Sequence, residues 1–126
     1  MDYKIKDVMT KLDLTVHTVR HYCDSGLVPN LRYNPHGNRI FDEQSINWLQ
    51  AASFLRAAGL AISDIKYYFD LCLLGKSTIE QRVQILLELK TKAEQELKSA
   101  QLRMDCIAQK VKSCEEILGG QREDDC

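Results

Sequence analysis

The feature that most constrains the fold is a run from Thr78 to Leu118 that contains neither glycine nor proline. Its apolar residues repeat every seven positions, and eleven of the twelve seam positions are apolar. The run therefore predicts a coiled-coil helix rather than an ordinary surface helix. The d series is Ile79, Leu86, Ala93, Ala100, Ile107 and Cys114, and the a series is Val83, Lys90, Leu97, Met104, Val111 and Leu118.

Such a helix needs a partner to cover its seam. At about 1.5 Å per residue it is a rod of about 60 Å, too long to bury its stripe on the residues that precede it. No second helical pattern of similar length exists in the chain, so we expect a homodimer with the seam residues as its dimerisation surface. Ala93 and Ala100 allow close approach, and Lys90 is expected to fix register or orientation at some cost in stability. The heptad alone does not separate parallel from antiparallel pairing.

The spacing of apolar residues and the positions of glycine and proline divide the chain into three parts. They are a compact, mainly helical domain over residues 1–75, the dimerisation helix over 76–118, and a flexible acidic tail over 119–126. The net charge of −1 does not by itself indicate a nucleic-acid binder. Its distribution is uneven, because residues 1–41 carry six Lys/Arg against four acids together with all three histidines.

Other function classes are disfavoured by composition. No apolar run approaches the roughly eighteen residues of a membrane span, and the N-terminus lacks a signal-peptide centre, so we expect a cytoplasmic protein with no membrane partner. The five cysteines form no CxxC pair, which argues against a disulfide framework. No catalytic triad, phosphate-binding glycine loop or paired-carboxylate site is present, so neither an enzyme nor a cofactor is expected.

Two short helical patterns joined at "KLDL" predict a helix-turn-helix. The second pattern begins with Thr15 as its N-cap and ends at Ser25-Gly26. Val16, Val19 and Cys23 lie on one side, suited to packing against the first helix. The other side offers donors to phosphates and base edges: Thr15, Thr18 and Tyr22 at i, i+3 and i+7, flanked by His17, Arg20 and His21. A merely polar, exposed helix is the alternative interpretation of these residues.

A small hairpin is predicted to follow, and two further helices after it. "LVPNLRYNPHGNRIF" places β-forming residues on either side of "NPHG". Such a wing reaches the adjacent DNA backbone or minor groove through Tyr33, His36, Asn38 and Arg39. "DEQSINWLQAASFLRAA" predicts a helix capped by Asp42, and "SDIKYYFDLCLLG" one that begins at Ser63 and ends before Gly75.

Three motifs in this order resemble the MerR family of bacterial transcription regulators. They are "TVRHYCDSGLVP", "GNRIF" and "FLRAAGLAISDI", and they span roughly residues 3–69. The resemblance implies a winged helix-turn-helix domain followed by a long helix that forms an antiparallel dimerisation coil. It further implies binding to a pseudo-palindromic operator in double-stranded promoter DNA. An effector then makes the dimer distort that DNA so that RNA polymerase can engage.

The resemblance also assigns roles to individual residues. Arg20 and Tyr22 would hold phosphates or base edges, with His17 and Thr18 facing the groove. Arg39 would hold the backbone from the wing, Arg56 would add a phosphate contact, and Tyr33 and Asn38 are further candidate contacts. This chain departs from the family pattern at two positions. His21 replaces the commoner tyrosine, which predicts a slight pH sensitivity of operator affinity, and Cys23 stands where an acid is usual.

Cysteine thiols can serve as sensors of metals or oxidants. Cys106 and Cys114 lie eight residues apart on uninterrupted helix, a rise of about 12 Å, too far for two ligands of one zinc or copper ion. No metal site is therefore predicted. Cys72 lies just before Gly75, near the predicted junction with the long helix, and is a candidate thiol sensor, although a buried structural cysteine is the commoner case.

Three classes of function follow from these observations. The leading prediction is a dimeric, sequence-specific transcription regulator that responds to an unidentified small-molecule effector or stress. The second is an architectural or excisionase-like protein that bends DNA without an effector, which the sustained heptad disfavours. The third is a coiled-coil adaptor whose N-terminal domain binds protein.

Overall fold

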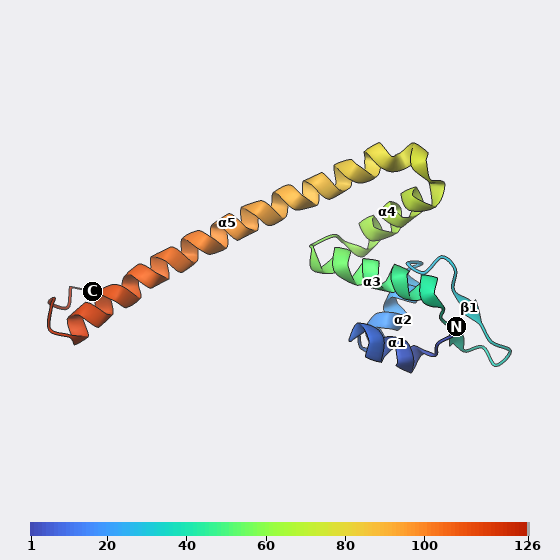
Figure 1. Cartoon of the computed structure of the whole chain (residues 1–126), viewed down its shortest axis with the longest axis horizontal. Helices are drawn as coiled ribbons and strands as arrows, with labels where there is room; N and C mark the ends of the chain where they lie inside the picture. The colour runs from blue at the N-terminus through green and yellow to red at the C-terminus, as the bar shows by residue number, and fades with distance from the viewer. Residues whose placement is uncertain (126) are drawn as a thin grey trace. The chain divides into compact units, whose positions relative to one another are not determined.

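The computed structural model describes residues 1–125, and its helices and strands follow the predicted order (Figure 1). The chain is mainly helical, with a two-stranded wing and a long C-terminal helix, as predicted. The elements are α1 (Ile5–Leu12), α2 (Val16–Asp24), β1 (Arg32–Tyr33), β2 (Arg39–Ile40), α3 (Glu43–Ala57), α4 (Ile62–Leu74), the short 3₁₀ helix η1 (Lys76–Thr78) and α5 (Ile79–Leu118).

Two of the predicted N-caps are confirmed and one helix start is shifted. Thr15 caps α2 by accepting a hydrogen bond from the Thr18 backbone N–H at 3.1 Å. Asp42 caps α3 by accepting one from the Ser45 N–H at 2.9 Å. By contrast, α4 begins at Ile62 rather than Ser63, and its N-cap residue Ala61 makes no side-chain capping bond. The serine therefore lies inside the first turn instead of capping it.

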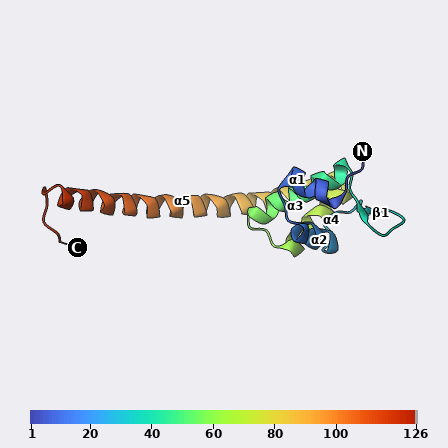
Figure 2. The ribbon, with the colours of Figure 1, turned by 90° about the horizontal axis from the view of Figure 1, so that it is seen from below.

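The predicted hairpin is confirmed. β1 and β2 pair antiparallel with Arg32 opposite Ile40 and Tyr33 opposite Arg39. The turn is held by the Asn34 side chain, which accepts hydrogen bonds from the backbone N–H groups of residues 36 and 38, both at 2.9 Å. Gly37 has φ of 80°, a conformation that favours glycine. Figure 2 shows this hairpin loop extending past the helices beside it.

One hydrophobic core joins the first four helices and the base of the hairpin. Val8 of α1 and Val19 of α2 are fully buried, which is the packing expected of a helix-turn-helix. They share the core with Phe41 after β2, Leu49 of α3 and Phe69 of α4. These contacts fix α2 and the wing to one scaffold.

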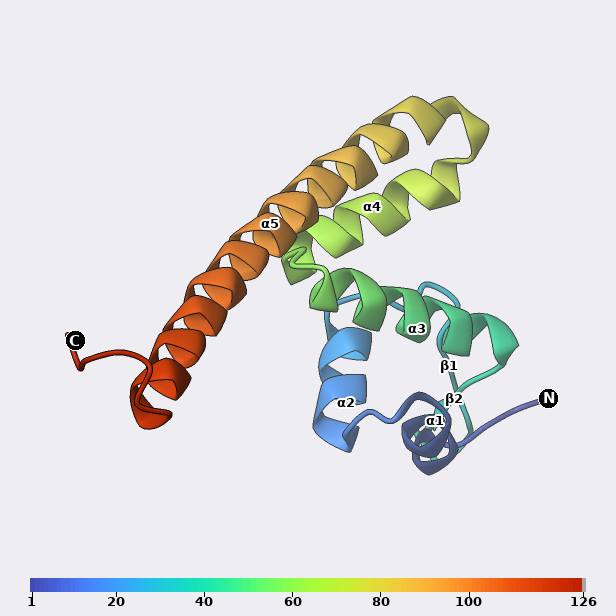
Figure 3. The same cartoon turned by 60° about the vertical axis from the view of Figure 1, so that its left-hand side comes forward.

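The compact unit extends to Leu89, whereas the predicted domain boundary lay at residue 75. Thr78 of η1 is buried, and its hydroxyl donates a hydrogen bond to the Leu71 carbonyl at 2.6 Å. After η1 the first turns of α5 run back beside α4 (Figures 1 and 3), and Leu89 packs against the core. We call Met1–Leu89 the winged unit. The second unit begins at Lys90 within α5.

The apolar seam of α5 is exposed in the single chain. Leu97 is 72% exposed, and Met104 and Ile107 are 58% and 62% exposed. Cys106 and Cys114 are exposed free thiols. None of the helices over the described residues 1–125 has the length and apolar character needed to cross a membrane.

Candidate nucleic-acid interface

Helix α2 presents basic side chains to solvent. His17, Arg20 and His21 are exposed, and within residues 1–125 none of them forms an ion pair. Thr18 is half-buried, and its hydroxyl accepts a hydrogen bond from the Thr15 hydroxyl at 2.9 Å. The exposed side of α2 therefore offers free donors of the kind that contact DNA phosphates and base edges.

The structure corrects the prediction that Tyr22 lies on this exposed side. Tyr22 is only 6% exposed and belongs to the hydrophobic core together with Val19, one turn earlier on α2. Burying a large aromatic ring stabilises the packing of α2, so the ring is held inside the domain. Cys23, predicted on the packing side, does pack against the core.

A basic cleft lies between the start of α1, α2 and the hairpin. Its volume is about 650 Å³, and among the described residues Asp2 is the only acidic one that lines it. The basic residues that line it are Lys4, Lys6, Arg20, His36 and Arg39. Positive groups from three separate elements that converge on one concave surface are suited to a phosphate backbone.

Lys4 and Lys6 were not among the predicted DNA contacts. In the sequence they contribute only to the charge of residues 1–41, because nothing local indicates what lies opposite the start of α1. An antiparallel bridge between Tyr3 and Phe41 joins this segment to the end of the hairpin strand β2. The bridge places both lysines on the same cleft as Arg20.

Arg39 has a structural partner in addition to its place on the cleft. Its guanidinium lies 2.7 Å from the Asp24 carboxylate at the end of α2, and its side chain is 24% exposed. Its Nε atom is buried and has no hydrogen-bond partner within residues 1–125. The ion pair links the wing directly to the C-terminal end of α2. Arg39 therefore holds the wing against α2, a role that the sequence did not reveal.

We expect Asp24→Ala to weaken binding of the chain to its operator about three- to tenfold, although it removes a negative charge near DNA. The reason is that Arg39 and the wing lose their fixed position beside α2, while stability falls by only about 1 kcal/mol or less. Gel-shift titration and thermal unfolding measure the two effects. Asp64→Ala, which removes an exposed carboxylate from α4, is the control. Affinity equal to or above wild type in Asp24→Ala would contradict the positioning role.

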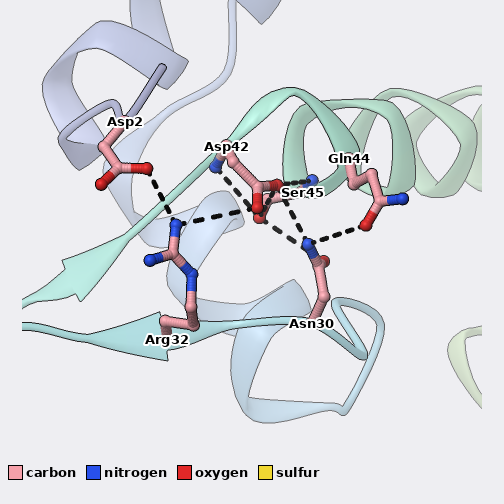
Figure 4. A network of polar contacts seen from close by, with 6 residues as sticks. All are labelled: Asp2, Asn30, Arg32, Asp42, Gln44 and Ser45. Atoms are coloured by element: carbon pink, nitrogen blue, oxygen red, sulfur yellow. Dashed lines mark hydrogen bonds and ion pairs between the residues drawn. The ribbon is translucent and has the colours of Figure 1, made fainter.

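A second polar network anchors the base of the hairpin (Figure 4). Arg32 of β1 lies 2.8 Å from the Asp2 carboxylate and 3.7 Å from that of Asp42. The Asn30 side chain donates to Asp42 at 3.0 Å. Hydrogen bonds to its carboxylate lower the pKa of Asp42. The bond from the Ser45 backbone N–H has the largest effect, and those from the Asn30 and Ser45 side chains add to it. Through these two ion pairs, Arg32 joins the hairpin to the N-terminal segment and to the start of α3.

The remaining predicted contacts are exposed. Tyr33 is 59% exposed on β1, and Asn38 lies at the end of the hairpin turn. Arg56 lies exposed in the last turn of α3 and does not line the basic cleft. If Arg56 contacts DNA, it does so away from the cleft.

Burial raises the pKa of the Cys23 thiol to about 11, and the nearby Arg39 charge only partly offsets this. Cys23 is therefore protonated near neutral pH. Because the folded pKa exceeds the ordinary value of 9.0, its contribution to stability is complete below about pH 9 and is lost as pH rises toward 11. We expect the free energy of unfolding of wild type to fall more steeply than that of Cys23→Ala between pH 9 and 11. Urea titrations measure this, and parallel curves would contradict it.

Cys72 of α4 is half-buried and free. It lies beside Tyr68, whose pKa is raised mainly by burial and further by Cys72, while the charge of Arg82 opposes the rise. The Cys72 thiol thus has a phenol beside it. Within residues 1–125, no three His, Cys, Asp or Glu side chains form a group suited to a metal ion.

The chain is similar to known regulatory proteins. Residues 3–72 match the family model described as MerR HTH family regulatory protein, which is more than half of the chain. The chain belongs to the MerR family. A relative from Haemophilus influenzae, an uncharacterized HTH-type transcriptional regulator, is 33% identical over 92 residues, which are 73% of this chain and 67% of that protein.

Two further proteins extend the MerR comparison. The HTH-type transcriptional regulator AdhR from Bacillus subtilis is 34% identical over 84 residues, which are 67% of this chain and 60% of AdhR. The crystal structure of HiNmlR, a MerR family regulator lacking the sensor domain and bound to promoter DNA, superposes with a TM-score of 0.79 at 24% identity. That match covers 94% of both chains and supports the fold.

Proposed function

We propose that this MerR protein is a transcription regulator that binds a pseudo-palindromic promoter operator as a homodimer. The observation that carries the proposal is the basic cleft, where Lys4, Lys6 and Arg20 converge with the wing. The exposed side of α2 beside it is suited to the major groove, and the wing to the flanking backbone. Two such units related by twofold symmetry would match an inverted repeat.

The exposed seam of α5 supports the homodimer. Its apolar side chains repeat over almost six heptads, and such a surface is covered in a stable protein. In keeping with the family, we propose that the coil is antiparallel. The regulated step would be distortion of the operator, whose energy cost depends on DNA sequence, so that RNA polymerase can engage the promoter.

The proposal is tested by footprinting on the promoter region upstream of the gene that encodes this protein. We expect protection of one inverted repeat, and an affinity at least about a thousandfold above that for a duplex with both half-sites scrambled. Equal affinity for the two duplexes would contradict a sequence-specific regulator and favour the architectural alternative.

An effector is part of the proposal, and Cys72 is its candidate thiol target. In vitro transcription from the same promoter, with a panel of electrophiles, metals and aromatic compounds, compares wild type with Cys72→Ser. A response lost only in Cys72→Ser would support a thiol sensor. A response retained in Cys72→Ser would assign the effector to a different site.

A further inference from the structure

The exposed seam of α5 contains enough information to specify how two copies pair. We propose that two α5 helices pair antiparallel in the register in which residue i lies opposite residue 197 − i of the second copy. This inference rests on the homodimer proposed above, and adds its register. It assigns the occupant of the exposed apolar residues at the start of α5, where Ile79 is 50% and Val83 46% exposed. They would be covered by the last turns of the second copy's α5.

The first argument is that this register leaves no seam residue unpaired. Antiparallel helices place each a position opposite a d position of the partner. The sum 197 satisfies this for all twelve seam residues: Ile79 with Leu118, Val83 with Cys114, Leu86 with Val111, Lys90 with Ile107, Ala93 with Met104, and Leu97 with Ala100. Sliding one helix by a heptad in one direction leaves Cys114 and Leu118 without a seam partner. Sliding it by a heptad in the opposite direction leaves Ile79 and Val83 without one.

The second argument concerns side-chain size. At the centre of the proposed register, Ala93 faces Met104, and Ala100 faces Leu97, so each small residue meets a large one. In a parallel coil each seam residue faces its own copy, which stacks alanine on alanine and leaves space between the helices. Parallel pairing also brings Lys90 against Lys90 of the second copy, where two like charges repel.

The third argument is charge complementarity beside the seam. The g positions are the residues directly before the a positions, and antiparallel helices bring them close to the g positions of the partner. The proposed register places Glu96 beside Arg103 of the second copy, twice by symmetry. Neither residue forms an ion pair within the described residues of its own chain. The two slipped registers instead place Glu96 beside Glu96, or Arg103 beside Arg103. One outer pair, Glu80 with Glu115, is like-charged in the proposed register and lies near the coil ends.

The register has a consequence for DNA recognition. A slip of one heptad changes the separation between the two α5 starts by about 10 Å, at about 1.5 Å per residue. Half-sites on DNA recur about every 34 Å, so a slip of that size would misplace one unit on the operator. The central residues of α5 would thereby help to set the operator spacing.

Charge reversal in the full-length chain tests the register. In the proposed register, Glu96→Arg and Arg103→Glu each create two like-charged pairs, and the double variant restores two opposite pairs. We expect each single variant to weaken the dimer about tenfold in sedimentation equilibrium, and the double variant to return to within about twofold of wild type. Glu88→Arg and Lys98→Glu make the same charge changes at exposed positions off the seam, and should leave the dimer unchanged. Circular dichroism confirms that every variant keeps its helix content.

Other outcomes overturn the proposal. Single variants that dimerise as wild type, or a double variant as weak as the two singles combined, would exclude this register. Cross-linking gives a second measurement, in a chain that also carries Cys106→Ser and Cys126→Ser. In this background Val83→Cys should form a disulfide with Cys114 of the second copy on mild oxidation. The covalent dimer should disappear when Cys114→Ser is added. Covalent dimers through Cys114 in that background without Val83→Cys would indicate parallel pairing. A monomeric wild type would instead contradict the homodimer itself, while the footprint tests operator specificity separately.

Discussion

A fragment of residues 1–89 is expected to bind the operator at least about a hundredfold more weakly than the full chain, while it remains folded. Two winged units joined by the coil bind two half-sites together, and linking two binding modules commonly raises affinity by about 10² to 10⁴. The fragment lacks every seam residue from Lys90 onward, which is most of the seam. Each winged unit would therefore bind alone. Gel-shift titration on one operator measures the loss.

The position of the cut follows from the structure. Arg82 donates hydrogen bonds to the Thr78 hydroxyl at 3.1 Å and to the Gly75 carbonyl at 3.2 Å, and Leu89 packs against the core. A fragment ending at residue 75, the boundary predicted from sequence, loses these contacts and is expected to unfold at a lower temperature than the fragment 1–89.

Leu97→Glu in the full-length chain is the matched test, because it disrupts the seam without removing residues. It should lose operator affinity to a similar extent and sediment as a monomer. If the fragment 1–89 bound the operator within about threefold of the full chain, pairing of the two units through α5 would not be needed for recognition.

Features that depend on near neighbours in the sequence were predictable. The cap at Thr15 requires only a residue three positions away, and the hairpin requires only the turn around Gly37. The heptad of α5 likewise needs no knowledge of the rest of the fold. Helix ends were less certain, as the start of α4 shows.

Tyr22 was misplaced for a geometric reason. At about 100° per residue on α2, it lies about 40° from the half-buried Thr18 and about 60° from the buried Val19, so the helical period does not decide its side. The packing of α1 and α3 against α2 decides it. A hydrophobic ring at the boundary of two faces turns inward when neighbouring helices can cover it.

Contacts across long stretches of sequence were not predictable. The pairing of Arg39 with Asp24 depends on how the hairpin folds back on α2, and the place of Lys4 on the cleft depends on the bridge between Tyr3 and Phe41. Both features combine ordinary charged residues without a local motif. The resemblance to MerR regulators predicted a DNA contact for Arg39, but neither its pairing with Asp24 nor the place of Lys4 on the cleft.

Replacing Arg20 with alanine is expected to lower operator affinity at least about a hundredfold. Arg20 is exposed on α2, lines the basic cleft and has no ion-pair partner among residues 1–125, so its guanidinium is free for DNA. A charged hydrogen bond contributes about 1.5–3 kcal/mol, and a homodimer loses two of them. Gel-shift titrations at several salt concentrations, with wild-type and base-substituted operators, measure the effect. Lys92→Ala, which removes an exposed charge from α5, is the control.

The same data separate the two roles predicted for Arg20. If it holds a phosphate, affinity falls equally for all operator variants, and the slope of log affinity against log salt decreases in magnitude by about two, one for each protomer. If it reads a base edge, the slope changes little, and discrimination is lost at one symmetric pair of base positions. The position of Arg20 on a cleft shared with Lys4 and Lys6 favours the phosphate role. Unchanged affinity in Arg20→Ala, with Lys4→Ala and Lys6→Ala also silent, would move the DNA interface away from this cleft.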